Sequence, residues 1–189
     1  MKVPLFPLNT VLFPGGPLPL RIFEPRYVDM VSRCMKDDAP FGVVLIREGA
    51  EVGPASSCDV GTLARIVDWY QGSDGLLGIT AIGTDRFRLY SSARQDDGLN
   101  VGEVEKIPAP SPVSLPDVHR ELPKVLLTIL DDLGRLYENV ERLPHDAAWV
   151  AWRFVEILPI DLTQKQRLLE SDDVLGTLDL VARVLHGQG

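Results

Sequence analysis

The sequence is poor in cysteine, in positive charge and in long apolar runs. Its two cysteines, Cys34 and Cys58, are too few for a disulfide framework of the secreted kind or for a zinc site built from C-x-x-C pairs. Lysine and arginine total 19 against 27 acidic residues, and the formal net charge of −8 argues against broad, non-specific binding to nucleic acid. No window approaches about 18 consecutive apolar residues, so the sequence predicts no membrane span. These absences favour a cytoplasmic protein with reduced thiols.

Motifs of catalysis are also missing. The chain contains no G-x-x-x-x-G-K-[ST] loop for phosphate, no H-E-x-x-H zinc motif and no G-x-S-x-G nucleophile turn. The histidines His119, His145 and His186 lie far apart in the sequence. Cys58 is a lone thiol in a predicted loop, without a neighbouring histidine or cation in sequence. We therefore predict no catalytic residue, no metal site and no cofactor.

The prolines are concentrated at the N-terminus, with six of the 15 at positions 4, 7, 14, 17, 19 and 25. Proline breaks a helix, so this apolar stretch does not fit the helical core of a signal peptide. It predicts instead short extended segments, with a turn at Gly15-Gly16-Pro17 and a strand over Leu18–Ile22. Pro25 suits the first position of a helix, and apolar residues at helical spacing then predict a helix over roughly residues 25–36.

The next part of the chain is typical of strands joined by short turns. The turns Ser73-Asp74-Gly75 and Asp96-Asp97-Gly98 predict two hairpins. Sequential strands without intervening helices favour a mainly antiparallel sheet curled into a barrel. The predicted strands are Phe41–Arg47, Val60–Tyr70, Leu76–Ile82, Arg86–Tyr90 and Leu99–Ile107. Alternation within Val60–Tyr70 predicts that Leu63, Arg65, Val67 and Trp69 share one face of that strand.

A proline-rich linker over residues 108–116 separates these strands from a helical part. Ser114 is a candidate N-cap with Asp117 at the third position, and Pro123 implies a kink or a delayed start of the main helix. Further helices are predicted over Asp146–Leu158, from Thr163 to about Leu169, and from Ser171 onward. The predicted class is therefore α+β, with a barrel subdomain over residues 1–110 and a helical bundle over residues 111–189.

Five stretches of the sequence carry a recognisable pattern. They are Pro4–Gly16 (PLFPLNTVLFPGG), Leu20–Tyr27 (LRIFEPRY), Val60–Ile66 (VGTLARI), Gly83–Leu89 (GTDRFRL) and Lys165–Glu170 (KQRLLE). In this order they resemble the Lon protease N-terminal domain family, across nearly the whole chain. The resemblance implies a PUA-like β-barrel followed by a small helical bundle, which agrees with the class predicted from the residues.

The resemblance also implies a function in protein recognition. In the family this domain contributes to recognising substrate polypeptides and to assembly of the protease. The ATPase and Ser–Lys protease domains of that family are absent from this sequence, so we expect a free-standing, non-enzymatic substrate-recognition domain. The expected partners are unfolded or client polypeptides and a protease or another protein, rather than nucleic acid or a membrane. A weak homodimer is compatible with this reading.

The motif Phe23-Glu24-Pro25-Arg26-Tyr27 has a structural and a functional reading. In the structural reading, Pro25 begins a helix, the two aromatic rings pack on the barrel, and the charged pair binds backbone or partner charges. In the functional reading, the motif lines a groove for an unfolded peptide. The structural reading carries more weight, because the family offers no catalytic role for these residues. The candidate peptide-binding residues are Phe13, Phe23, Glu24, Arg26 and Tyr27.

Two other functions compete with polypeptide recognition. A PUA-like barrel can bind RNA, and Arg86 and Arg88 on one strand, with Arg94 downstream, form a candidate basic patch. Nearby aspartates and the net charge of −8 favour a solvated face instead. The second competitor is an unrecognised hydrolase, for which Ser57 or Cys58 would be the residue to substitute first.

Overall fold

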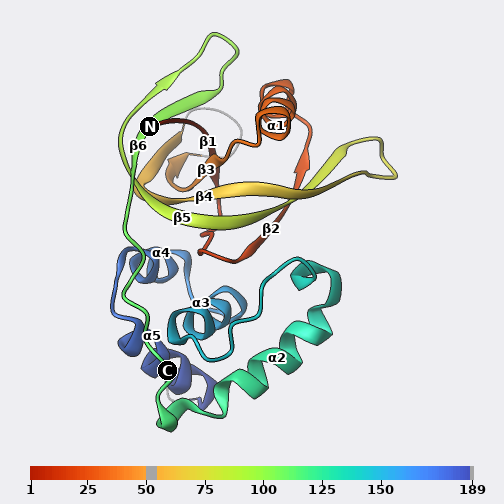
Figure 1. Ribbon diagram of the computed structural model, residues 1–189. Helices are drawn as coiled ribbons and strands as arrows, with labels where there is room; N and C mark the ends of the chain where they lie inside the picture. Colours follow the sequence, from red (N-terminus) through yellow and green to blue (C-terminus); the bar gives the residue numbers. More distant parts are fainter. Residues whose placement is uncertain (50–54, 188–189) are drawn as a thin grey trace.

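Figure 1 shows the computed structural model, which describes residues 1–49 and 55–187. A β-barrel flanked by one helix lies above a group of helices, with the N-terminus in the barrel and the C-terminus at the far end of the helices. We call these parts the barrel and the helical part. The predicted α+β class, with strands followed by helices, is confirmed.

The described residues contain six strands in one sheet, in the order β2-β5-β4-β3-β1-β6. An additional pairing between β5 and β6 closes the barrel. The pairing of β1 with β3 is parallel, whereas every other recorded strand pair is antiparallel. The strands are β1 (Lys2–Leu8), β2 (Pro17–Ile22), β3 (Phe41–Gly49), β4 (Ala55–Gln71), β5 (Leu77–Arg94) and β6 (Asn100–Lys106).

Strand β5 corrects one prediction. Leu76–Ile82 and Arg86–Tyr90 were expected as separate strands, but a single strand runs through the intervening Gly83-Thr84-Asp85. The first half of β5 pairs with β2 and the second half with β6. Backbone bonds at Gly83 and a bond from the Thr84 hydroxyl to the Leu63 carbonyl hold the middle in place. Residues that resemble a turn are therefore kept extended by neighbours from distant parts of the chain.

Strand β2 lies at the open end of the strand order and pairs only with β5 among the described residues. The Gly83 N–H donates to the Gly16 carbonyl (2.9 Å), so Gly16 and Gly83 are hydrogen-bonded to each other, and the next pair along the two strands is Pro17 with Ile82. Hydrogen-bonded and non-hydrogen-bonded pairs alternate along an antiparallel ladder, so the backbone groups of Pro17 and Pro19 point away from β5. Because proline has no N–H, the free edge of β2 offers only carbonyls at these positions.

Helix α1 (Pro25–Asp37) follows β2 and confirms the predicted helix. Pro25 stands in its first turn, where a missing N–H costs nothing. Its buried face, which includes Tyr27, Met30 and Val31, packs in one cluster with Ile79 and other residues of the sheet. Asp38 ends the helix in the left-handed conformation, with φ 49°.

The helical part comprises α2 (Leu122–Leu133), α3 (Ala147–Ile157), α4 (Leu162–Glu170) and α5 (Val174–Leu185), with single 3-10 turns at Asp117–His119 (η1) and Gly134–Tyr137 (η2). The delayed start that Pro123 implied is confirmed, since α2 begins at Leu122. Ser114 is not an N-cap: it forms an isolated antiparallel bridge with Asp146. The side chains of Asp146, Asp161 and Asp173 cap α3, α4 and α5, where Thr163 and Ser171 had been expected for the last two.

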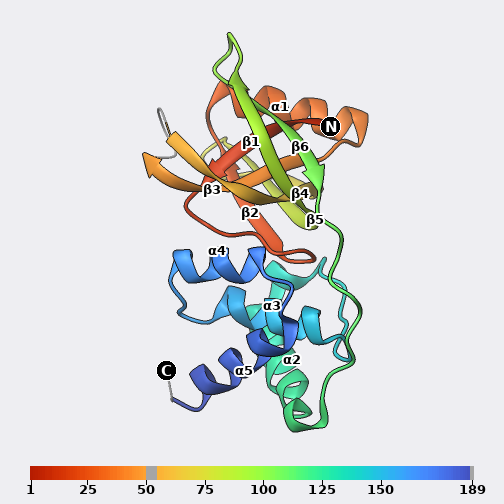
Figure 2. The same ribbon diagram turned by 90° about the vertical axis from the view of Figure 1, so that its left-hand side faces the viewer.

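The barrel and the helical part share a hydrophobic cluster. Val11, Phe13, Leu45 and Val60 of the barrel pack with buried residues of α2, α3, α4 and α5. Figure 2 shows α4 and α3 directly beneath the barrel, while the segment after β6 runs down one side. We call this contact region the joint.

Candidate functional site

Three residues of the predicted motif form a compact structural cluster. The Arg26 guanidinium donates to a Glu24 carboxylate oxygen (Nε–Oε2 2.8 Å) and to the Gly98 carbonyl (2.7 Å). It also lies 4.7 Å from the centre of the Tyr27 ring. The Tyr27 ring in turn stacks on Phe6, with ring centres 3.9 Å apart. These contacts tie the start of α1 to β1 and to the β5–β6 hairpin, as the structural reading expects for Tyr27 and the charged pair. They do not include Phe23, which that reading had also packed on the barrel and which is 61% exposed.

The two phenylalanines among the predicted site residues have opposite environments. Phe13 is fully buried in the joint, where its ring centre lies 6.3 Å from that of Trp152. It therefore has no surface to offer to a peptide. Phe23 is 61% exposed, directly after β2. The structure does not bring the five candidate residues to one surface, and Phe23 alone presents a freely exposed aromatic side chain.

Arg86 contributes to the joint rather than to a basic patch. Only 2% of it is exposed, and its guanidinium donates to the carbonyls of Leu169 (2.9 Å), Pro108 (3.1 Å) and Ser171 (3.3 Å) and to the Asp172 carboxylate (2.5 Å). Arg88, two residues along the same strand, is exposed. The expectation that both arginines share one surface is wrong, because Arg86 satisfies the C-terminal carbonyl groups of α4 and its following loop.

A second buried arginine meets the Pro14-Gly15-Gly16 turn. The fully buried Arg153 of α3 donates to the Pro14 carbonyl (2.9 Å) and holds the Glu156 carboxylate through two bonds of 2.8 and 2.6 Å. A side chain at Gly16 would collide with this carboxylate, and Gly15 adopts φ +74°. The two glycines are required because the turn is tight and lies directly against the ion pair.

Burial shifts the proton equilibria around this ion pair. Burial raises the pKa of Glu156 from 4.5 to about 7, against the opposing effect of Arg153. Burial also raises the pKa of Tyr137, whose hydroxyl lies 3.4 Å from a Glu156 carboxylate oxygen. Burial lowers the pKa of Lys165, whose ammonium donates to the Glu156 backbone carbonyl (2.9 Å). The cluster is therefore a poorly hydrated polar site at the edge of the joint.

Two adjoining cavities lie between the barrel and the helical part beside this cluster. The outer cavity, of about 630 Å³, is lined by Pro19, Asp68, Tyr70, Thr80, Arg135, Leu136, Glu138 and Asn139. The inner cavity, of about 440 Å³, is lined by residues 8–12 and 17–20 together with Leu136, Tyr137, Glu156 and Lys165. Pro19 and Leu136 line both, so we treat the two cavities as one interlobe groove.

Three exposed aromatic residues lie at one end of the sheet, and one of them, Tyr70, lines this groove. Trp69 and Tyr70 of β4 are 58% and 48% exposed, and Tyr70 lines the outer cavity. The ring of Tyr70 covers Gly78, where any side chain would displace it. Phe23 belongs to the same end of the sheet, because Ile22 pairs with Leu77, which pairs with Gln71 of β4. We call Phe23, Trp69 and Tyr70 the aromatic rim.

The sequence analysis named Phe23 but missed the rest of this site. Alternation in β4 had placed Val67 and Trp69 on the same face as Leu63, yet both are exposed whereas Leu63 is buried. Irregular pairing between Ile66 and Asp68 marks where the strand leaves the core. Consecutive exposed aromatics close to a hairpin turn were the available signal.

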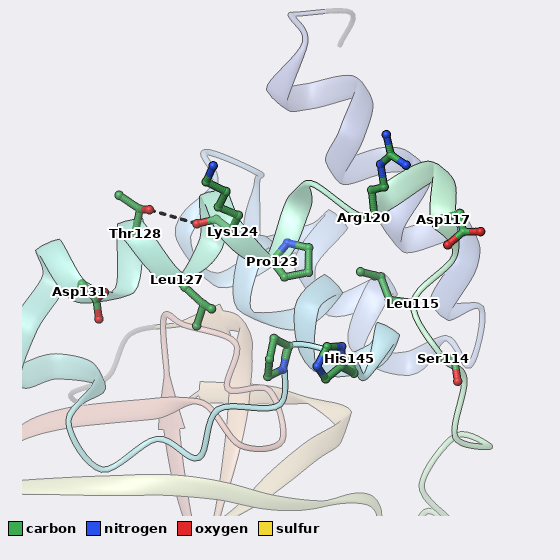
Figure 3. Close-up of a pocket in the computed structure, with 11 residues that line it drawn as sticks. Ser114, Leu115, Asp117, Arg120, Pro123, Lys124, Leu127, Thr128, Asp131 and His145 are labelled. Carbon is green, nitrogen blue, oxygen red and sulfur yellow. Dashed lines mark hydrogen bonds between the residues drawn. The ribbon is translucent and has the colours of Figure 1, made fainter.

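A further cavity, of about 860 Å³, lies within the helical part (Figure 3). Leu115, Pro123 and Leu127 surround its centre, and charged residues such as Asp117 and Asp131 lie at its two ends. Asp131 is already paired with Arg142 (2.6 Å). This cavity contains none of the residues that the sequence analysis singled out as a binding site.

Two further classes of site can be assessed in the described residues. No three histidine, cysteine, aspartate or glutamate side chains in residues 1–49 and 55–187 come together as a metal site. None of the helices in these ranges combines the length and apolar character needed to cross a membrane.

Comparison with known proteins decides the family. A family model described as the ATP-dependent protease La (LON) substrate-binding domain matches residues 2–187. The chain belongs to this family. Among its Lon relatives, Lon protease 2 of Myxococcus xanthus is 26% identical over 97% of this chain and 23% of its own length. The protein cereblon of Danio rerio is 29% identical over 65% of this chain and 31% of its own length. The chain thus spans less than a third of each of these relatives.

Solved structures of the Lon N-terminal domain share the fold. The crystal structure of a Lon N-terminal domain protein from Xanthomonas campestris superimposes with a TM-score of 0.77 and 38% identity, covering 96% of this chain and 97% of that chain. The N-terminal domain of a Lon protease from the Mycobacterium avium complex gives a TM-score of 0.65 at 19% identity and supports the fold alone.

Four of the five segments that resemble the Lon family, all but Leu20–Tyr27, meet at or beside the joint of this Lon-type domain. Gly15 and Gly16 bond to Gly83, and Arg86 of the same segment bonds to Leu169. The Gln166 amide donates to the Val60 carbonyl (2.9 Å). The recognisable sequence therefore specifies how the barrel and the helical part are held together, whereas Trp69 and Tyr70 lie outside it.

Proposed function

We propose that this protein is a non-enzymatic module that recognises polypeptide segments through the interlobe groove and the aromatic rim. The observation that carries the proposal is that Tyr70, 48% exposed, lines the groove, while two more of the four exposed aromatic side chains of the described residues, Phe23 and Trp69, lie at the same end of the sheet. Large exposed apolar side chains at the mouth of a groove are typical of protein-binding surfaces. Membership of the Lon substrate-binding family supports polypeptides as the ligand class.

The groove combines features that suit an unfolded chain. Its walls carry apolar side chains such as Leu136 and Pro19, and isolated charges line both cavities. The free edge of β2 lacks donors at Pro17 and Pro19, so we expect recognition through side chains of the bound chain rather than by strand addition. Client polypeptides, as the partners of a Lon-type domain, fit this mode.

The RNA-binding alternative loses the observation that had prompted it. Arg86 is buried in the joint, so the barrel strand presents Arg88 without its expected neighbour. An isolated arginine on a chain of net charge −8 does not form the cationic surface that phosphate backbones require.

The test uses a dye-labelled polypeptide that cannot fold because its cysteines are reduced and alkylated. We expect fluorescence anisotropy to detect its binding to the wild-type protein. The double variant Trp69→Ser/Tyr70→Ser should bind about tenfold or more weakly, because aromatic anchors dominate such interfaces.

Tyr90→Ser is the matched control, since Tyr90 is 63% exposed but lies on the second half of β5, away from the rim. It should leave the affinity unchanged. Absence of binding by the wild type, or an equal loss in the control, would refute the proposal.

A further inference from the structure

The inner cavity is lined by one cation, Lys165, which feels the charge of Glu156 but forms no direct ion pair within residues 1–49 and 55–187. Its charged lining residues are Glu156 and Lys165. The Glu156 carboxylate is compensated by two bonds from the buried Arg153. Lys165 donates to a neutral acceptor, the backbone carbonyl of Glu156 (2.9 Å), and forms no recorded ion pair. An ammonium has three donors, so Lys165 retains hydrogen-bonding capacity toward the cavity.

The surroundings of this ammonium strengthen its attraction for an anion. Lys165 is partly buried, and burial lowers the pKa of its ammonium, which shows that water solvates the charge poorly. A negative group from a ligand would replace the missing hydration and form a charge-assisted hydrogen bond. The Tyr137 hydroxyl lies on the same cavity wall and donates its one proton to Glu156 over 3.4 Å, so Lys165 is the cationic donor available to a ligand there.

Most of the remaining lining of the inner cavity is apolar, with Asn9 and Thr10 as the polar exceptions. Leu8, Val11, Leu12, Leu18, Leu20 and Leu136 supply apolar side chains. The outer cavity, which adjoins the inner one at Pro19 and Leu136, carries an excess of negative charge, because its lining includes Asp68 and Glu138 but only one cation, Arg135. The two ends of the groove therefore differ in charge. A cation lies at the inner end, acidic residues lie at the outer end, and apolar side chains lie between them.

We propose that the inner cavity binds a carboxylate at or near the end of an apolar polypeptide segment, with Lys165 as its charge partner. The inference rests on the proposed function. It adds which kind of polypeptide segment is bound and in which direction that segment runs along the groove. The carboxylate lies beside Lys165, apolar side chains contact the leucines, and the preceding residues leave past Tyr70 and the aromatic rim. A C-terminal carboxylate and the side chain of an aspartate or glutamate share this chemistry.

The experiment compares three acetylated octapeptides that are versions of a single apolar sequence, Gly-Ser-Gly-Ala-Leu-Ala-Val-Leu. The first has a free C-terminal carboxylate, the second a C-terminal amide, and the third an amide with glutamate as its last residue. Each competes with the labelled unfolded polypeptide for the wild-type protein. We expect the free acid to bind about tenfold more tightly than the amide, the size of a charged hydrogen bond in a partly buried site. The glutamate peptide tells whether a side-chain carboxylate suffices.

Lys165→Gln should remove this preference by weakening the free acid to the level of the amide. Lys124→Gln, at an exposed lysine of the cavity in the helical part, should keep it. Equal binding of acid and amide by the wild type, or a preference that survives Lys165→Gln, would overturn the inference. In either case binding of the unfolded polypeptide would leave the proposed function standing. If neither the polypeptide nor any peptide binds, both fail.

Discussion

The joint and the aromatic rim use charged and aromatic side chains in opposite ways. In the joint, Arg86 and Arg153 are 2% and 0% exposed, and their guanidinium groups join segments far apart in the sequence. At the rim, Trp69 and Tyr70 are 58% and 48% exposed, and neither side chain belongs to the buried core. The joint therefore determines whether the two parts hold together, whereas the rim is free to serve a partner. Substitutions in the two regions should have separable effects.

The largest effects are expected in the joint, and the first of them is at Arg86. Arg86→Ala leaves the carbonyls of Leu169, Pro108 and Ser171 without their donor, so the free energy of unfolding should fall by about 2–3 kcal/mol. Urea denaturation followed by circular dichroism measures this loss.

Arg88→Ala is the control, because Arg88 is exposed on the same strand. It should change stability by less than about 0.5 kcal/mol. Equal losses in the two variants would contradict the structural role assigned to Arg86.

An effect of similar size is expected from pH, again in the joint. Because burial raises the pKa of Glu156 from 4.5 to about 7, the folded protein binds this proton more tightly than the unfolded chain does. The stabilising contribution is complete below pH 4.5 and is lost as the pH rises through about 7. The loss should be on the order of 3 kcal/mol across this window.

Glu156→Gln isolates that contribution. The substitution removes the titrating carboxyl group and leaves in place the three groups that face it, Arg153, Tyr137 and Lys165. The stability of the wild type relative to Glu156→Gln should therefore decrease from pH 4.5 to 7.5. A constant difference between the two urea midpoints would show that Glu156 keeps an ordinary pKa.

The smallest effect on stability is expected at the rim. Trp69→Ser removes a side chain that is 58% exposed, so the free energy of unfolding should change by less than about 0.5 kcal/mol. On the proposed function, the same variant should bind the unfolded polypeptide several-fold more weakly. A loss of stability as large as that of Arg86→Ala would mean that the rim and the joint are not independent.

Local patterns predicted most of the elements, because local chemistry determines them. Pro25 marked the start of α1, and Ser73-Asp74-Gly75 marked the β4–β5 hairpin. Errors arose where distant residues decide. The middle of β5 resembles a turn by composition but is kept extended by Gly16 and Leu63, and Ser114 pairs with Asp146 instead of capping a helix.

The candidate site was less predictable than the fold. Phe13 and Arg86 looked available from their local sequence, and only the packing of the helical part against the barrel shows that both are buried. The interlobe groove brings Tyr70, Leu136 and Lys165 together from three separate segments, and no spacing along the chain encodes that meeting. The tight Gly15-Gly16 turn was the one local sign of a close approach.

The prolines of β2 have a consequence for solubility. A sheet with an open edge is a template on which extended chains can stack into aggregates, and that risk is greatest for a protein that works among unfolded polypeptides. At Pro17 and Pro19 an arriving chain finds acceptors but no donors, so a continuous ladder of hydrogen bonds cannot grow outward from β2. On the proposed function, such an edge lets the protein contact an unfolded chain through side chains without becoming the first layer of a fibril.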